Sequence, residues 1–283
     1  MGEPLVAGEA WRQAQGGDSV MAPKDLVLTL WRGQVETHVK VAGNGPPLVY
    51  FHGAEGLKWD GWLSRLAERH TVYAPEHPGT SPGLPNTIEA IDSLWELVLF
   101  YDELFEALGL ERPAVMGHSF GGMVAAEIAA TRPERVGKLV LVSPVGLWRE
   151  DVPVFNWMIS SREQLFQASF HDPRSEKAQR AFAFPTDPGP LQDAIIQQTW
   201  SLACTGKFTW PIPDKGLKRR IHRIKAPTLL VWGRSDRVVP VVYAEEFRKH
   251  LPQAQVRLFE HSGHLPYIEE EEGVTAAIEE FLR

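Results

Sequence analysis

Short hydrophobic runs alternate with longer amphipathic stretches along most of the chain, from residue 25 to its end. The short runs predict buried β-strands, and the stretches with apolar side chains at every third or fourth position predict helices. Because helices separate most of the strands, the pattern predicts an α/β fold with a mostly parallel sheet covered by helices on both faces. The predicted strands are PLVYFHG (47–53), HTVYAPEHPG (70–79), PAVMG (113–117), GKLVLVSP (137–144), APTLLVWG (226–233) and QVRLFE (255–260).

The start of this pattern differs from the rest. The stretch LVLTLWRGQVETHVKVAG (26–43) predicts a hairpin that turns at Gly33 and Gln34, so the sheet is expected to begin with antiparallel strands. Helices are predicted from the apolar spacing near residues 59–66, 88–108, 120–131 and 273–282.

One long stretch, residues 144–225, has aromatic residues and helix-like pieces but no hydrophobic run typical of a core strand. It lies between two predicted strands, which indicates a helical insertion. Ligands of open α/β sheets bind outside the carboxyl ends of the strands, so a segment that leaves from such an end is placed to cover the site. The predicted organisation is a loose leader at 1–24 with Met21 as an alternative start, a core at 25–143 and 226–283, and a helical cap at 144–225.

The motif VMGHSFGG (115–122) places Ser119 between two glycines, Gly117 and Gly121, at the junction of a predicted strand and a predicted helix. Glycines at these positions allow a strand and a helix to approach closely around a strained serine. This context is typical of the G-x-S-x-G nucleophile elbow, which exposes the serine hydroxyl at the end of a strand. Ser119 is therefore the predicted nucleophile.

Two further residues follow later strands and complete the chemistry that Ser119 needs. Asp236 comes just after the strand at 226–233, and His264 lies in the loop after the strand at 255–260. A serine hydroxyl is a weak nucleophile, so we expect His264 to remove its proton and Asp236 to hold the imidazole in the required tautomer. The chain order Ser, Asp, His is the order expected for this elbow.

From FHGAEG through GHSFGG and GRSDRVVP to GHLPYIEE, the sequence resembles the α/β-hydrolase superfamily. It looks most like the branch of capped serine esterases and carbon–carbon bond hydrolases, over residues 25–283. The resemblance implies an eight-stranded, mostly parallel sheet with a helical lid between two core strands. It also implies an oxyanion hole formed by the backbone N–H groups of Ala54 and Phe120.

The resemblance leaves the substrate open. We expect a serine hydrolase that cleaves a small or medium, mainly apolar carboxylic ester, thioester or lactone through an acyl-enzyme. Glu55, in the predicted oxyanion loop, disfavours a substrate with a free carboxylate. One alternative is carbon–carbon bond cleavage of a vinylogous ketoacid, although such relatives often carry tryptophan where this chain has Leu265. The other alternative is a ligand-binding member of the fold without catalysis. The predicted substrate-contacting residues are Glu55, His118, Trp157, Phe166, Trp200, Trp210 and Leu265.

Composition excludes several other classes. The net charge of -7 argues against a nucleic-acid-binding surface, and the single cysteine, Cys204, fits a reducing cytoplasm. The chain has no apolar run long enough to predict a membrane span. It also lacks metal-site and phosphate-loop motifs, so we expect no metal and no cofactor. The expected partners are a small-molecule substrate and water, and the sequence leaves monomer and homodimer open.

Overall fold

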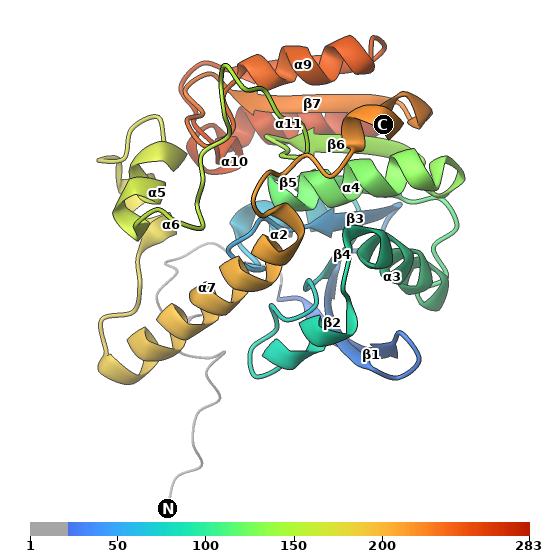
Figure 1. Cartoon of the computed structure of the whole chain (residues 1–283), viewed down its shortest axis with the longest axis horizontal. Helices are drawn as coiled ribbons and strands as arrows, with labels where there is room; N and C mark the ends of the chain where they lie inside the picture. The colour runs from blue at the N-terminus through green and yellow to red at the C-terminus, as the bar shows by residue number, and fades with distance from the viewer. Residues whose placement is uncertain (1–21) are drawn as a thin grey trace, which may run out of the picture.

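Eight strands form one sheet in the computed structural model, which describes residues 22–283 (Figure 1). The strand order is β1-β2-β4-β3-β5-β6-β7-β8, with β1 and β2 antiparallel to their neighbours and all other pairs parallel. The predicted mostly parallel sheet with an antiparallel start is thus confirmed. Residues 1–21 of the predicted leader lie outside the described residues. The strands are β1 Lys24–Leu30, β2 Val35–Ala42, β3 Pro47–Phe51, β4 Thr71–Pro75, β5 Ala114–His118, β6 Lys138–Val142, β7 Thr228–Gly233 and β8 Gln255–Phe259.

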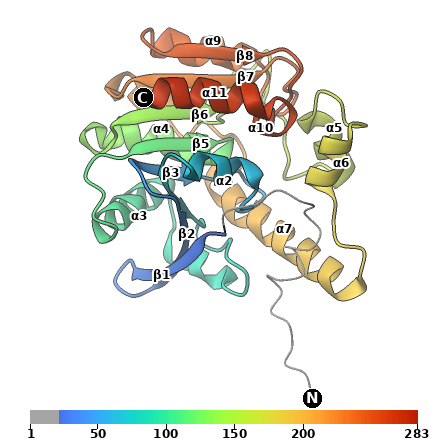
Figure 2. The same ribbon diagram turned by 180° about the vertical axis from the view of Figure 1, so that it is seen from behind.

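Helices cover both faces of the sheet. Helices α3 and α4 lie on the face seen in Figure 1, and α2 and α11 lie on the opposite face, seen in Figure 2. Helix α4 is buried from Phe120 to Ala130, because its small residues allow close contact with β5 and β6. The core helices are α2 Gly61–Ala67, α3 Leu94–Ala107, α4 Phe120–Thr131, α9 Val242–His250, α10 Pro266–Glu269 and α11 Glu271–Leu282, with short 3-10 helices at Pro85–Ala90, Pro133–Arg135 and Ile221–Arg223.

The helix predicted at residues 88–108 is shorter than expected. Helix α3 starts at Leu94, after a capping box in which the Ser93 hydroxyl accepts a hydrogen bond from the Glu96 N–H at 3.2 Å. The Glu96 carboxylate in turn accepts one from the Ser93 N–H at 3.1 Å. These bonds satisfy backbone donors that a helix start leaves free, and Ser93 itself has an extended backbone. The capping box therefore starts the helix at Leu94, although the apolar spacing of the sequence extends back to residue 88.

A helical segment connects β6 to β7 and contains no strand between residues 144 and 225. Residues 154–161 are irregular, and the first helix of the segment begins after Ser161, whose side chain caps it. Figure 1 shows the first three of these helices beyond the carboxyl ends of the parallel strands, whereas the last one packs against α4. We call residues 144–225 the cap segment. Its helices are α5 Arg162–Ser169, α6 Glu176–Phe182, α7 Pro188–Thr209 and α8 Leu217–Arg220.

Candidate active site

Ser119 lies at a sharp turn between β5 and α4, with a backbone conformation that residues other than glycine rarely adopt. Its φ is 53° and its ψ is -114°. The neighbouring glycines make this turn sterically possible. A Cβ on Gly117 would lie 2.2 Å from the Gly121 carbonyl oxygen, and a Cβ on Gly121 would lie 2.1 Å from the Phe51 carbonyl oxygen. Side chains at these two positions would push the helix away from the strands.

Asp236, His264 and Ser119 form a continuous chain of hydrogen bonds at the carboxyl edge of the sheet. The His264 Nε2 atom lies 2.9 Å from the Ser119 hydroxyl oxygen, and its Nδ1 atom lies 2.9 Å from the Asp236 carboxylate. The three residues follow β5, β7 and β8, which are parallel strands. All three are buried. The arrangement can pass a proton from the serine to the imidazole while the carboxylate orients the ring.

Contacts to the backbone hold this chain of groups in position. The Asp236 Oδ1 atom accepts hydrogen bonds from the N–H groups of Val238 at 2.9 Å and Val239 at 2.8 Å, which leaves Oδ2 for the histidine. The His264 N–H donates to the Ser169 carbonyl oxygen at 2.7 Å, so the cap segment touches the histidine loop directly. The Glu269 carboxylate accepts from the Gly263 N–H at 2.6 Å.

The backbone N–H groups of Ala54 and Phe120 lie at the two turns beside Ser119. Phe120 is the first residue of α4, where backbone N–H groups lack a helical partner. Within residues 22–283, neither N–H donates a hydrogen bond to another group. His52 orients the first turn, because its Nδ1–H donates to the Gly53 carbonyl oxygen at 2.7 Å and its Nε2 accepts from the His77 N–H at 3.1 Å. The carbonyl and N–H of the Gly53–Ala54 peptide point in opposite directions. The hydrogen bond that fixes the Gly53 carbonyl therefore also orients the Ala54 N–H.

Three buried, neutral histidines lie near Ser119, His264 and Asp236. Burial lowers the pKa of His52 and of His118 well below the usual value, and burial lowers the pKa of His77 to about 4. The nearby His264 ring further lowers the pKa of His118. His118 donates from Nε2 to the His264 carbonyl oxygen at 2.9 Å. These rings therefore supply fixed hydrogen bonds without adding positive charge beside the base.

A cavity opens over Ser119 and His264 and has two chemically different walls. The apolar side chains of its lining come mainly from the cap segment and form what we call the apolar wall, whereas the polar side chains come from the core and form the polar wall. We call this space the active-site cavity. Its polar wall includes Tyr50, Glu55, Lys58, Asp60, His118 and Tyr267, and its apolar wall includes Trp157, Leu165, Ala181, Phe182, Leu202, Val238, Leu265 and Ile268.

Four of the predicted substrate-contacting residues line the active-site cavity and three do not. Glu55, His118, Trp157 and Leu265 line it. The other three lie elsewhere in the structure. Phe166 packs against Phe170 and Phe182, Trp200 is half exposed on α7, and Trp210 lines a separate side pocket.

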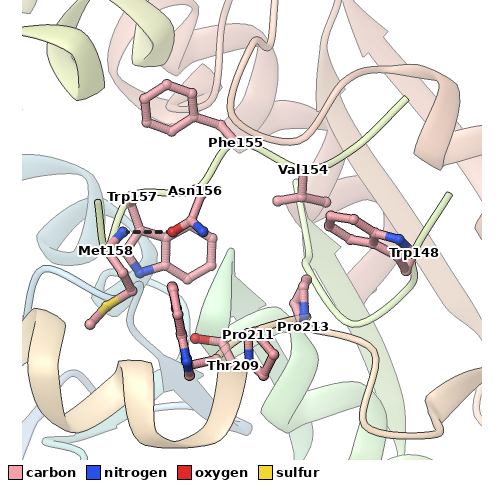
Figure 3. Close-up of a pocket in the computed structure, with 10 residues that line it drawn as sticks. Trp148, Val154, Phe155, Asn156, Trp157, Met158, Thr209, Pro211 and Pro213 are labelled. Carbon is pink, nitrogen blue, oxygen red and sulfur yellow. Dashed lines mark hydrogen bonds between the residues drawn. The ribbon is translucent and has the colours of Figure 1, made fainter. Parts of the chain in front are cut away.

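The side pocket lies between residues 154–158 and the chain that follows α7 (Figure 3). Trp157 lines both the side pocket and the active-site cavity, so the two spaces meet at this residue. The sequence analysis did not predict that Tyr50, Asp60 and Tyr267 line the active-site cavity. Each lies in or within a few positions of a recognised motif, and this proximity was the only signal in the sequence.

Two further properties concern residues 22–283. No group of three or more histidine, cysteine, aspartate or glutamate side chains in this range is arranged to hold a metal ion. No helix in the same range combines the length and apolarity that a membrane span requires.

Comparison with known proteins places these features in a family context. The family profile of the alpha/beta hydrolase fold matches residues 46–271. The chain is 28% identical over 245 residues to a pimeloyl-[acyl-carrier protein] methyl ester esterase of Nitrosomonas europaea, covering 82% of this chain and 93% of that protein. It is 27% identical over 249 residues to a 2-hydroxy-6-oxo-6-phenylhexa-2,4-dienoate hydrolase of Burkholderia cepacia, covering 80% and 84%.

Solved structures agree on the fold. A naproxen esterase from Bacillus subtilis superimposes with a TM-score of 0.72 at 17% identity, covering 98% of this chain and 97% of that one. At this level of identity, the likeness concerns the arrangement of strands and helices alone.

Proposed function

The chain belongs to the alpha/beta hydrolase family and is a hydrolase, and from this premise we propose that it cleaves a small or medium carboxylic ester through an acyl-enzyme on Ser119. The observation that carries the proposal is the pair of 2.9 Å hydrogen bonds that joins Asp236, His264 and Ser119. A buried serine, imidazole and carboxylate in this order form an activated nucleophile.

In the first half of the reaction, the Ser119 oxygen attacks the acyl carbon of the ester. The serine proton moves to His264 Nε2, and the carbonyl oxygen becomes an oxyanion that the Ala54 and Phe120 N–H groups stabilise. Each such donor contributes about 2.7–4 kcal/mol to the stability of the transition state. His264 then gives its proton to the leaving alcohol, and the carbon–oxygen bond of the ester breaks.

In the second half, water attacks the acyl-enzyme. His264 accepts a proton from the water, and the new oxyanion occupies the same two N–H groups. Collapse of this intermediate releases the carboxylic acid and returns the proton to Ser119. Asp236 remains ionised throughout and stabilises the imidazolium that forms in each half. Thioesters and lactones have the same acyl chemistry and fall within the proposal.

The apolar wall of the active-site cavity supports a mainly apolar acyl group as the substrate. We assign residues 144–225 the role of a lid, because Leu165, Phe182 and Leu202 of this segment contribute to that wall. Burying an apolar acyl group against such side chains stabilises the complex by about 25 cal/mol for each Å² removed from water.

A fluorophosphonate probe tests the proposal directly, because it forms a covalent bond with an activated serine. We expect one probe molecule per wild-type chain and none on the Ser119→Ala variant. Ser143 supplies a matched control, since it is another buried serine with a positive φ, at the end of β6. Ser143→Ala should label like wild type. A folded wild-type protein that does not label would contradict the proposal.

Carbon–carbon bond cleavage is the second candidate, favoured by the similarity to the Burkholderia cepacia hydrolase. The ester is preferred because Leu265 follows His264 and because Glu55 lines the cavity, where it would repel an anionic ketoacid. Comparing turnover of p-nitrophenyl butyrate with turnover of a ring-fission ketoacid distinguishes the two. Faster turnover of the ketoacid would reverse the preference.

A further inference from the structure

Asp60 is a carboxyl group on the polar wall of the active-site cavity that the proposed chemistry does not use. It lies at the start of α2, where its Oδ1 atom accepts a hydrogen bond from the Leu63 N–H at 2.9 Å. Its side chain is half buried. Within residues 22–283, no lysine, arginine or histidine forms an ion pair with Asp60. Its carboxyl also accepts hydrogen bonds from the backbone N–H groups of Trp62 and of Asp60 itself, so the helix start supplies donors but no positively charged side chain.

The other carboxyl group in the cavity has partners of its own. The Glu55 carboxylate accepts a hydrogen bond from the Gln198 side-chain amide at 2.8 Å, and Arg162 interacts with it electrostatically. Lys58 is the one lysine or arginine among the residues that line the cavity, and its amine donates to the Ala181 carbonyl oxygen at 3.4 Å. Asp60 is thus the carboxyl of the cavity that no positively charged side chain stabilises.

Two tyrosines stand beside Asp60 on the same wall. Tyr50 and Tyr267 are 4% and 8% exposed and interact electrostatically with Asp60. The Trp62 ring stacks on Tyr267 with centroids 4.4 Å apart and meets Tyr50 edge-on at 5.7 Å. This packing holds both phenol rings in place. Phenol oxygens accept hydrogen bonds from an ammonium group, and aromatic faces attract cations.

We propose that Asp60, Tyr50 and Tyr267 form a subsite for a primary ammonium group of the substrate that Ser119 cleaves. This inference rests on the proposed function and refines it: the apolar acyl part packs on the cap wall and the ammonium group binds the core wall. Burial raises the pKa of Asp60 to about 6, so the carboxyl is still ionised at neutral pH. A bound ammonium group would supply the charge compensation and hydrogen bonds that the Asp60 carboxylate loses when burial removes it from water.

Calorimetry on the Ser119→Ala protein tests the subsite without requiring turnover. The probes are hexylammonium, hexanol and hexanoate, which share one apolar tail and differ in the charge of the head group. At about pH 8, where Asp60 is ionised, we expect hexylammonium to bind at least about tenfold more tightly than hexanol, and hexanoate to bind most weakly. Equal affinities for hexylammonium and hexanol would overturn the proposal.

Asp60→Asn, added to Ser119→Ala, separates the charge from the helix cap, because asparagine is also a good N-cap residue. It should remove the preference for hexylammonium over hexanol and leave the affinity for hexanol within about twofold. Glu55→Gln is the matched control in the same cavity and should keep most of the preference. Loss of the preference in Glu55→Gln alone would overturn the assignment to Asp60.

A second variant covers the case in which Asp60→Asn folds poorly, as judged by circular dichroism. Tyr267→Phe removes only the hydroxyl group and should weaken hexylammonium binding severalfold with little change for hexanol; an equal change for both would overturn the role of the phenol. Fluorophosphonate labelling of the chain with Ser119 intact reports on the proposed function separately. Normal labelling with no ammonium preference would refute this subsite alone.

Discussion

At the scale of single residues, Ser119 is held in a strained conformation by its surroundings. A positive φ costs a residue with a side chain about 1–3 kcal/mol. The Ser119 N–H donates to the Val142 carbonyl oxygen at 3.0 Å, and its carbonyl oxygen accepts from the Met123 and Val145 N–H groups at 3.1 and 3.2 Å. These bonds, made to a neighbouring strand and to the following helix, fix the turn and direct the hydroxyl to His264.

Substitutions at Ser119, Asp236 and His264 should each remove most turnover. Because the three groups act as one unit, Ser119→Ala, His264→Ala and Asp236→Asn should lower kcat for p-nitrophenyl acetate by about 10³–10⁶. The double variant Ser119→Ala with His264→Ala should lose no more than either single variant. Steady-state kinetics measures both effects, with melting curves as the control for folding. Near wild-type turnover in His264→Ala would move the role of the base to another residue, with His261 the first to test.

Asp60 should destabilise the folded protein above pH 6. Burial raises its pKa from 3.8 to about 6, with the charge of Glu271 adding to the effect, so between these values the folded state binds more protons than the unfolded state. The contribution of Asp60 to the free energy of unfolding therefore falls as the pH rises from about 4 to 6. Above pH 6 the ionised carboxyl destabilises the folded state by its full amount.

Asp60→Asn removes that cost and keeps the helix cap. At about pH 8 the variant should be more stable than wild type by about 1–2 kcal/mol, a value reduced for partial exposure to solvent. Near pH 4 the difference should disappear because the wild-type carboxyl is then neutral. Urea unfolding at both pH values measures this. A variant less stable than wild type at the higher pH would contradict it.

At the scale of elements, the nucleophile turn depends on the close approach of β3, β5 and α4. Gly121→Ala should lower the free energy of unfolding by about 1–3 kcal/mol or more, because its Cβ would lie 2.1 Å from the Phe51 carbonyl oxygen. Gly189→Ala is the control, since nothing lies within 4 Å of a Cβ there and α7 gains a better helix former. It should stabilise the protein by about 0.4–1 kcal/mol. Thermal unfolding measures both; equal melting temperatures would refute the steric account.

The cap segment should set the length of the acyl chain through Trp157. Because Trp157 lines both the active-site cavity and the side pocket, Trp157→Ala should join the two spaces. We expect the ratio of kcat/KM for p-nitrophenyl octanoate over acetate to rise about tenfold, since each newly buried methylene contributes about 0.8 kcal/mol.

Trp210 provides the comparison for this prediction. It lines the side pocket but not the active-site cavity, so Trp210→Ala should leave the octanoate-to-acetate ratio unchanged. A rise of similar size in both variants would show that loosening of the cap, rather than removal of the Trp157 side chain, controls selectivity for acyl-chain length.

At the scale of the whole molecule, one edge of the parallel sheet gathers groups from distant parts of the chain. Strands β5, β7 and β8 end at this edge, and the cap segment contributes the Ser169 carbonyl that binds the His264 N–H. Nucleophile, base and oxyanion donors all come from the chain, so activity should not require a metal. Enzyme dialysed against EDTA should keep its full kcat; a loss restored by added Zn²⁺ or Mg²⁺ would contradict this.

Local sequence patterns were enough to predict the succession of strands and helices, because short hydrophobic runs and amphipathic spacing are local properties. It also placed Ser119, Asp236 and His264 after three separate strands, and parallel strands present their carboxyl ends on one edge. The apolar spacing misplaced the start of one helix because it does not reveal a local helix cap. The capping box at Ser93 ended the helix that was expected to begin at residue 88.

Which side chains line the active-site cavity depends on tertiary packing and could not be predicted from the sequence. Phe166, Trp200 and Trp210 have the same apolar character as Trp157, yet of these four residues only Trp157 lines the active-site cavity. Likewise, Asp60 looks like an ordinary helix cap in the sequence. Its unpaired charge beside Tyr50 and Tyr267 arises because β3, α2 and α10 meet there. Burial and charge compensation depend on contacts between residues far apart in the chain, which a local pattern does not contain.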